Sequence, residues 1–248
     1  MRRRGLKAVS VFLTFLVCIG TAVAQDLQAL LSRFQSEQDH ATKEMILDSI
    51  TRNYPDSGSA LLGIARQTND TDTRWLAIRG IGSLRFHDAT PFLKQSLNSE
   101  SSYVRANAAR ALGEIHELSA VPALICLLKV EHDNGVIEQT TLALQMLDAK
   151  AAVPVLKNRV MNPSAQTRLW ILGAIEVLDS KKDVPFFAAF LSDKEEIVAA
   201  FAARVIERFT GQDFGFPRCG PEGGPCSYGD GVKNARVWWN AHHQEWAE

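Results

Sequence analysis

The sequence has few of the features that mark a catalytic or nucleic-acid-binding protein. It contains no Gly-rich phosphate loop, no nucleophile elbow and no carboxylate pair in a convincing catalytic setting. Lys and Arg form no run after the N-terminal stretch, so the positive field that non-specific nucleic-acid binding needs is missing. No segment has a convincing β-strand pattern. We therefore expect an all-α protein with no catalytic residue, no metal, no cofactor and no nucleic-acid partner.

The N-terminus predicts export. Four basic residues precede an apolar run over residues 8–24, which ends in the small-x-small pattern Ala22-Val23-Ala24. We expect signal-peptidase cleavage before Gln25 and a mature chain in the periplasm or outside the cell. A retained membrane anchor is the alternative, but the run is slightly short for a span of about 20 residues.

The mature chain is expected to be acidic and soluble. Cleavage leaves 23 of the 27 Lys and Arg residues against 28 Asp and Glu residues, a net charge of −5. No second long apolar run follows, so we expect no membrane span in the mature chain. Its length of about 224 residues is enough to bury a sizeable core as one domain.

Three cysteines remain after cleavage, and an oxidising compartment permits disulfides. Cys219 and Cys226 flank a loop rich in Gly and Pro and are the natural pair, which leaves Cys126 single. A metal site that adds His242 and His243 is the alternative. It is disfavoured because the two cysteines are further apart than is usual and adjacent helical side chains point about 100° apart.

The strongest signal is an internal repeat. Four short matches contain prolines that are 31, 32 and 31 residues apart. Each proline suits the first turn of a helix, where its missing N–H costs nothing. The matches are Thr90–Leu93, Val121–Leu124, Val153–Leu156 and Val184–Phe187. The apolar pairs on the predicted helices are Leu93 and Leu97, Leu124 and Leu128, Leu156 and Val160, and Phe187 and Leu191.

A longer helical pattern precedes each proline. In the clearest copy, residues 103–115, one face carries Val104, Ala108, Leu112 and Ile115 at helical spacing. Polar residues that suit the N-cap precede most copies. The N-cap candidates are Asp72, Ser101 or Ser102, Ser164 and Ser192.

The repeating unit is thus a long helix, a turn and a short proline-started helix, and stacked units cover one another's apolar faces. The predicted fold is an all-α, right-handed α-solenoid of stacked antiparallel helix pairs with a C-terminal capping helix. The predicted parts are a signal peptide (1–24), N-terminal helices with a degenerate first repeat (25–70), repeats (71–210), and a Cys/Gly-rich loop with a Trp-rich capping helix (211–248).

The units resemble short bacterial HEAT-like repeats, a kind also found in the phycobilin lyase family. Val104-Arg105 followed by residues 108–113 matches that consensus, and Arg74 and Arg168 match the same arginine. Ile137 replaces this arginine in another copy, as valine does in the last one, so a polar ladder between repeats is expected to break there. Such a motif is specific for architecture and says little about activity.

The C-terminal helix is expected over about residues 230–245. Val232, Trp239 and Trp246 recur on one face, and Trp238 broadens it. The interpretation we favour is a cap over the open end of the solenoid. An aromatic patch that binds a partner is the alternative.

The resemblance implies that the second helices of the pairs line the concave face. We expect a non-catalytic scaffold of the cell envelope or exterior that binds a protein or peptide there. The alternatives are a phycobilin-lyase-like enzyme or chaperone acting on a chromophore-bearing protein, which export argues against, and a structural envelope component. Catalysis by Cys126 is disfavoured because no base is near it in sequence. The expected partner-binding residues are Lys94, Gln95, Ile125, Cys126, Lys157 and Asn158.

Overall fold

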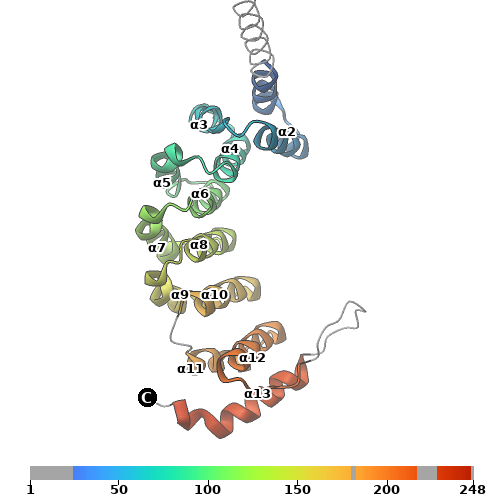
Figure 1. The fold of residues 1–248 in the computed structure, drawn as a ribbon, viewed down its shortest axis with the longest axis vertical. Coiled ribbons are helices and arrows are strands. Elements are labelled where there is room, and N and C mark those ends of the chain that lie inside the picture. The colour runs from blue at the N-terminus through green and yellow to red at the C-terminus, as the bar shows by residue number, and fades with distance from the viewer. Residues whose placement is uncertain (1–24, 180–182, 217–227, 247–248) are drawn as a thin grey trace, which may run out of the picture. The chain divides into compact units, whose positions relative to one another are not determined.

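A computed structural model describes residues 25–179, 183–216 and 228–246, and these form helices and loops without a β-strand (Figure 1). The chain divides into two compact units, residues 1–120 and 121–248. Residues 1–24, Cys219 and Cys226 lie outside the described residues, so export and the disulfide stay predictions. None of the described helices is long and apolar enough to cross a membrane.

The helices of the first unit lie in two layers. The long helices α4 and α6 pack side by side, α3 and α5 flank them, and α2 packs on α4 at the N-terminal end (Figure 1). The elements are a helix over residues 25–36, α2 (His40–Asn53), α3 (Gly58–Gln67), α4 (Thr71–Ser83), η1 (His87–Ala89), α5 (Thr90–Ser96), α6 (Ser102–Glu114) and η2 (Leu118–Ala120).

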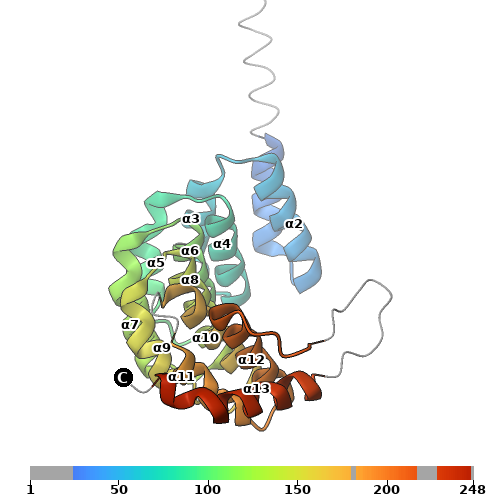
Figure 2. The ribbon, with the colours of Figure 1, turned by 60° about the horizontal axis from the view of Figure 1, so that its bottom comes forward.

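The second unit repeats this arrangement. The long helices α8, α10 and α12 pack in order, and the short helices α7, α9 and α11 lie beside them (Figures 1 and 2). The elements are α7 (Val121–Val130), α8 (Asn134–Met146), η3 (Lys150–Ala152), α9 (Val153–Arg159), α10 (Ala165–Leu178), α11 (Val184–Ala188), η4 (Ala189–Ser192), α12 (Glu196–Thr210), α13 (Gly229–His242) and η5 (His243–Trp246).

The predicted helix pairs are confirmed. Pro91, Pro122, Pro154 and Pro185 each occupy the second position of a short helix. All eight apolar residues predicted to follow these prolines are buried, as are the four on the apolar face of α6. Burial of each large aliphatic side chain stabilises the fold by about 2–3 kcal/mol. The fold is therefore an all-α solenoid of antiparallel helix pairs.

The turn after three long helices uses a left-handed residue that is not glycine. Arg85, His116 and Asp148 have φ values of 50°, 62° and 47°. The next amide reaches back into the helix, as where Phe86 donates to the carbonyl of Ile81 at 3.1 Å. This bond satisfies a carbonyl at the helix end. The sequence gives little warning of the turn because glycine, its usual marker, is missing.

Helix α13 covers α12 at the end of the second unit (Figure 2). Val232 packs in a cluster with Ala199 and Ala200, and Ala235 is buried on the same face. Arg236 donates its Nε to the carbonyl of Leu191 at 2.7 Å. The predicted capping helix is therefore confirmed, although its tryptophans are only half-buried.

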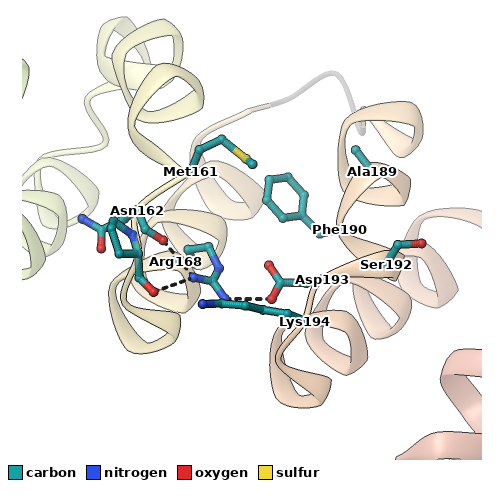
Figure 3. A pocket seen from close by; sticks show the side chains of 9 residues that line it. Met161, Asn162, Arg168, Ala189, Phe190, Ser192, Asp193 and Lys194 are labelled. Atoms are coloured by element: carbon teal, nitrogen blue, oxygen red, sulfur yellow. Dashed lines mark hydrogen bonds and ion pairs between the residues drawn. The ribbon is translucent and has the colours of Figure 1, made fainter.

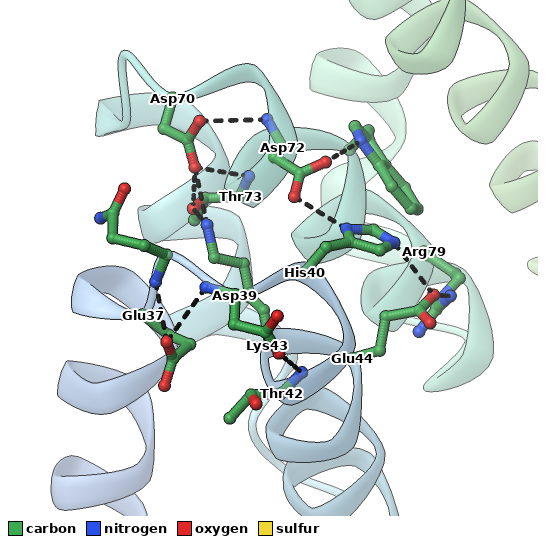
Figure 4. A network of polar contacts seen from close by, with 12 residues as sticks. Glu37, Asp39, His40, Thr42, Lys43, Glu44, Asp70, Asp72, Thr73 and Arg79 are labelled. Atoms are coloured by element: carbon green, nitrogen blue, oxygen red, sulfur yellow. Dashed lines mark hydrogen bonds and ion pairs between the residues drawn. The ribbon is translucent and has the colours of Figure 1, made fainter.

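A polar network joins α2 to α4 (Figure 4). Lys43 is 3% exposed and donates its Nζ to Asp70 Oδ2 at 2.8 Å and to Thr73 Oγ1 at 2.9 Å. Asp70 also caps α4 by accepting from two backbone amides. The predicted cap, Asp72, is wrong; its carboxylate instead accepts from Trp75 Nε1 at 2.9 Å. The hydrogen bonds from Lys43 and Thr73 hold the pKa of Asp70 well below its ordinary value of 3.8.

The contact between α4 and α6 predicts opposite effects for two glycine substitutions. A Cβ at Gly82 meets the backbone of Ala111 at 2.9 Å, whereas a Cβ at Gly63 in α3 meets nothing within 4 Å. We expect Gly82→Ala to lower the free energy of unfolding by about 1–3 kcal/mol through overpacking. Gly63→Ala should raise it by up to about 1 kcal/mol through helix propensity. Urea unfolding measures both, and equal shifts contradict the close approach.

The network in Figure 4 predicts a dependence of stability on pH. Because folding lowers the pKa of Asp70, its charged form stabilises the fold above the ordinary value of 3.8, and this contribution is lost as pH falls below it. Asp70→Asn should cost about 2–3 kcal/mol near pH 7, because it leaves the buried Lys43 charge without its carboxylate. Urea unfolding between pH 7 and pH 3 measures both effects.

The control for this pair is Lys43→Met, which removes the buried charge itself. We expect it to cost less than Asp70→Asn, because no unpaired charge is left inside the fold. A loss at pH 7 that is larger for Lys43→Met, or an unchanged acid sensitivity in Asp70→Asn, contradicts the role given to Asp70.

Candidate functional site

The arginine that matches the HEAT-like consensus shapes the surface between neighbouring short helices. Arg74, Arg105 and Arg168 each donate to backbone carbonyls that precede their own helix, all in the preceding loop except the carbonyl of Ala65, which lies near the end of α3. For Arg168 the acceptors are the carbonyls of Asn162 and Pro163, at 2.8 and 3.0 Å. Each guanidinium therefore ties the end of one short helix to the next long helix through charge-assisted bonds.

In α8, where the repeat arginine is replaced, an arginine from another helix binds the preceding loop. Ile137 stands at the arginine position of α8 and is buried. Arg159, at the end of α9, donates instead to the carbonyl of Glu131 in the loop before α8. The Glu131 carboxylate also accepts from the next two backbone amides at 2.9 Å. The sequence pattern missed this substitute because Arg159 comes from the following helix rather than from the repeat position.

One pocket in the second unit, called here the α9–α11 pocket, lies between the loop that follows α9 and the η4 turn that follows α11, and has a volume of about 440 Å³ (Figure 3). Figure 3 shows Met161 and Phe190 on opposite walls, with Arg168 and Asp193 below them. The pocket thus combines an apolar wall with a polar floor, as small-molecule sites do. Its lining residues are Met161, Asn162, Pro163, Arg168, Ala189, Phe190, Ser192, Asp193 and Lys194.

The floor of this α9–α11 pocket carries a buried ion pair. Arg168 is 4% exposed, and its Nη2 donates to Asp193 Oδ1 at 2.7 Å. Its Nε is buried and has no hydrogen-bond partner within the described part of the chain. Lys194 adds an exposed ammonium group at the rim. Two cationic residues against one carboxylate give the pocket a net attraction for anionic groups.

The first unit has an equivalent pocket between α3 and α5, also of about 440 Å³. Arg74 takes the place of Arg168, and Gln95 takes the place of Ala189. No acidic residue lines it, and the guanidinium of Arg66 lies 5.8 Å from the centre of the Phe92 ring. Its lining residues are Ala65, Arg66, Arg74, Pro91, Phe92, Gln95, Ser96, Ser99 and Val104.

The predicted partner-binding residues lie in different settings. In the first unit Gln95 lines the α3–α5 pocket, while Lys94 donates to Ser119 Oγ at 2.6 Å. In the second unit Asn158 lines a pocket of about 380 Å³, and Ile125 is half-buried. Cys126 is exposed and forms no disulfide with another described residue. Their role in binding stays a prediction.

Lys157, the last of the predicted partner-binding residues, forms ion pairs within the chain. Its Nζ lies 2.8 Å from Asp179 Oδ2, 2.7 Å from Asp183 Oδ2 and 4.8 Å from the centre of the Phe186 ring. Burial works against its charge, but the hydrogen bonds to both carboxylates outweigh this and raise the pKa of Lys157. Lys157 therefore clamps α9 to the segment before α11.

The histidines of the alternative metal site are held by backbone carbonyls. His242 Nδ1 lies 2.8 Å from the carbonyl oxygen of Trp238, and His243 Nδ1 lies 3.1 Å from that of Asn240. Within residues 25–179, 183–216 and 228–246, no three His, Cys, Asp or Glu side chains gather as metal ligands would.

These helix pairs, with their proline starts and loop-binding arginines, are those of HEAT-like repeats. Residues 58–145, about a third of the chain, match the family model for HEAT repeats. The chain is also similar in fold to the complex of CpcE and CpcF of phycocyanin lyase from Nostoc sp. PCC7120. The TM-score is 0.53 at 15% identity, over 86% of this chain and 94% of that one.

Sequence similarity extends to proteins of bilin metabolism. The chain is 34% identical over 109 residues to the bilin biosynthesis protein PecE of Mastigocladus laminosus, covering 44% of this chain and 40% of that protein. It is 37% identical over 100 residues to the phycocyanobilin lyase subunit alpha of Synechococcus elongatus, covering 37% and 36%. The chain thus spans about two fifths of the length of the curated relatives it matches.

These relatives correct two expectations from the sequence. A non-catalytic scaffold of the cell envelope or exterior, binding its partner on a concave face, is wrong because the similar proteins are bilin biosynthesis and lyase proteins. The expectation that the chain is not an enzyme conflicts with the same finding.

The ion pair under the α9–α11 pocket predicts a stability effect. Asp193→Asn keeps the side-chain shape but leaves the charge of buried Arg168 with carbonyl partners alone. We expect a loss of about 2–3 kcal/mol in the free energy of unfolding. The control is Asp213→Asn, which alters an exposed carboxylate that accepts from the Gly215 amide and should change stability by less than about 0.5 kcal/mol. Equal losses in urea unfolding contradict the assignment.

Proposed function

We propose that this chain is a phycobilin-lyase-like HEAT-repeat protein that binds a bilin and assists its attachment to an acceptor protein. The observation that carries the proposal is the similarity in sequence to three proteins named for bilin biosynthesis or phycocyanobilin attachment. The HEAT-repeat fold shared with a phycocyanin lyase complex is consistent with it.

The α9–α11 pocket supports this proposal through its chemistry. A bilin is a linear tetrapyrrole, which combines flat apolar rings with two carboxylate side chains. Met161 and Phe190 offer an apolar wall for the rings, and Lys194 offers an ammonium group at the rim for a carboxylate. The volume of about 440 Å³ lies within the range of small-molecule pockets. The pocket is open, so part of a bilin would remain exposed to an acceptor.

A protein partner is part of the proposal. The similar structure is a complex of two different chains. We propose that the complete lyase-like activity requires a second HEAT-repeat chain. Extended surfaces of repeat proteins suit such pairing, because each repeat adds contact area.

Binding of phycocyanobilin to the full chain tests the proposal. We expect micromolar binding with a change in the absorbance spectrum, because a bound bilin loses part of its conformational freedom. Lys194→Gln combined with Phe190→Leu should weaken binding by about tenfold or more, since one charge-assisted contact alone is worth about 1.5–3 kcal/mol. Absorbance titration measures the dissociation constant, and urea unfolding checks that the double variant is folded.

Lys233→Gln is the charge-matched control, because Lys233 is exposed on α13 outside the pocket. It should leave phycocyanobilin binding unchanged. The wild-type chain should also raise the amount of covalent bilin on an acceptor apoprotein in the presence of a second lyase chain, as read by zinc-enhanced fluorescence after denaturing electrophoresis. Absence of bilin binding by the wild-type chain contradicts the proposal.

A further inference from the structure

The charged residues that line the α3–α5 pocket are all cationic. Two of its nine lining residues are arginines and none is acidic. Arg74 is occupied, because its Nε donates to the carbonyl of Ala65 at 3.3 Å and its Nη2 to that of Thr68. Arg66 is exposed at the end of α3, where its guanidinium contacts the Phe92 ring and forms no hydrogen bond or ion pair with another described residue. One guanidinium is therefore available to a ligand.

The available guanidinium contacts an aromatic ring. The centre of the Phe92 ring lies 5.8 Å from it, and this cation–π contact uses none of its five N–H donors. Phe92 is half-buried at the start of α5. Because a guanidinium is planar and presents its N–H donors as a fixed fork, it loses less entropy when it forms the paired hydrogen bonds that a carboxylate accepts.

The other polar groups of the pocket suit a peptide backbone. Gln95 is exposed beside the guanidinium and carries both an amide donor and an amide acceptor. Ser96 and Ser99 are less free, because Ser96 Oγ donates to the carbonyl of Phe92 at 2.9 Å and Ser99 Oγ accepts from the Ser101 amide at 3.3 Å. The pocket therefore offers one strong carboxylate contact and one adaptable amide contact.

We propose that the α3–α5 pocket binds an acidic segment of a partner protein, with Arg66 as the residue that contacts a carboxylate and Gln95 as the residue that contacts the adjacent backbone. Charge complementarity selects an acidic segment over a neutral or basic one. The inference is independent of the bilin proposal, because it concerns a different pocket in the other unit.

A defined peptide tests this inference. The probe is a fluorescein-labelled, C-terminally amidated hexapeptide of alternating glutamate and serine, and its binding to the full chain is followed by fluorescence anisotropy at low salt. We expect Arg66→Gln to weaken binding by about tenfold or more, because a charge-assisted bond is lost. Phe92→Leu should weaken it less, since it removes only the support of the guanidinium. Raised salt should weaken binding to the wild-type chain.

Arg52→Gln is the matched control, because Arg52 is exposed in the same unit at the end of α2 and the substitution removes the same charge. It should leave the dissociation constant unchanged. Equal weakening in both variants places the contact outside the pocket and overturns the inference. No binding to the wild-type chain, or equal binding of the peptide with glutamine in place of glutamate, overturns it as well.

A competition experiment distinguishes a protein segment from a small carboxylate as the ligand of this pocket. Free glutarate should displace the labelled peptide only at concentrations far above those of the unlabelled peptide, because it lacks the backbone that Gln95 contacts. Displacement by glutarate at the same concentration as the unlabelled peptide overturns the protein-segment assignment.

Discussion

The structure depends on one constraint: a single helix pair cannot bury its own apolar face, so each pair must be covered by the next. The proline-started helices meet this constraint with buried pairs such as Leu124 and Leu128, both fully shielded from solvent. Where the stack ends, α13 covers α12 through Val232 and Ala235. Stability is therefore a sum of neighbour contacts, and side chains off the seam are free to vary.

The consensus arginine adds a second constraint, because it fixes where each loop runs. A buried guanidinium needs acceptors, and the loop carbonyls of Asn162 and Pro163 supply them for Arg168. The same bonds remove the cost of burying those carbonyls. The Arg159 contact with the Glu131 carbonyl shows that the loop must be tied down even where the repeat position is apolar.

Most of the fold could be predicted from the sequence, because helix starts and apolar spacing are local properties. Pro91 and its three counterparts marked the short helices, and the buried face of α6 followed from residue spacing. Contacts that join distant residues could not be predicted. Lys43, for example, pairs with Asp70, the N-cap of α4, which lies 27 residues later in the chain. The predicted binding face likewise included both Gln95, whose side chain is exposed, and Lys157, whose side chain pairs with two carboxylates.

The two pockets explain why a repeat architecture says so little about activity by itself. Both arise where the guanidinium of a repeat arginine, Arg74 or Arg168, holds a loop below two short helices. The two pockets share the same backbone arrangement but differ in the side chains of their walls. Phe190 and Met161 give one pocket an apolar wall, while Arg66 gives the other a cationic wall. Met161 and Arg66 are exposed, so substitutions there change what is bound at little cost in stability, whereas Phe190 is buried in the core and its substitution also affects packing. In this fold the side chains that line the pockets beside the short helices determine which ligands bind, and the average composition of the chain does not reveal them.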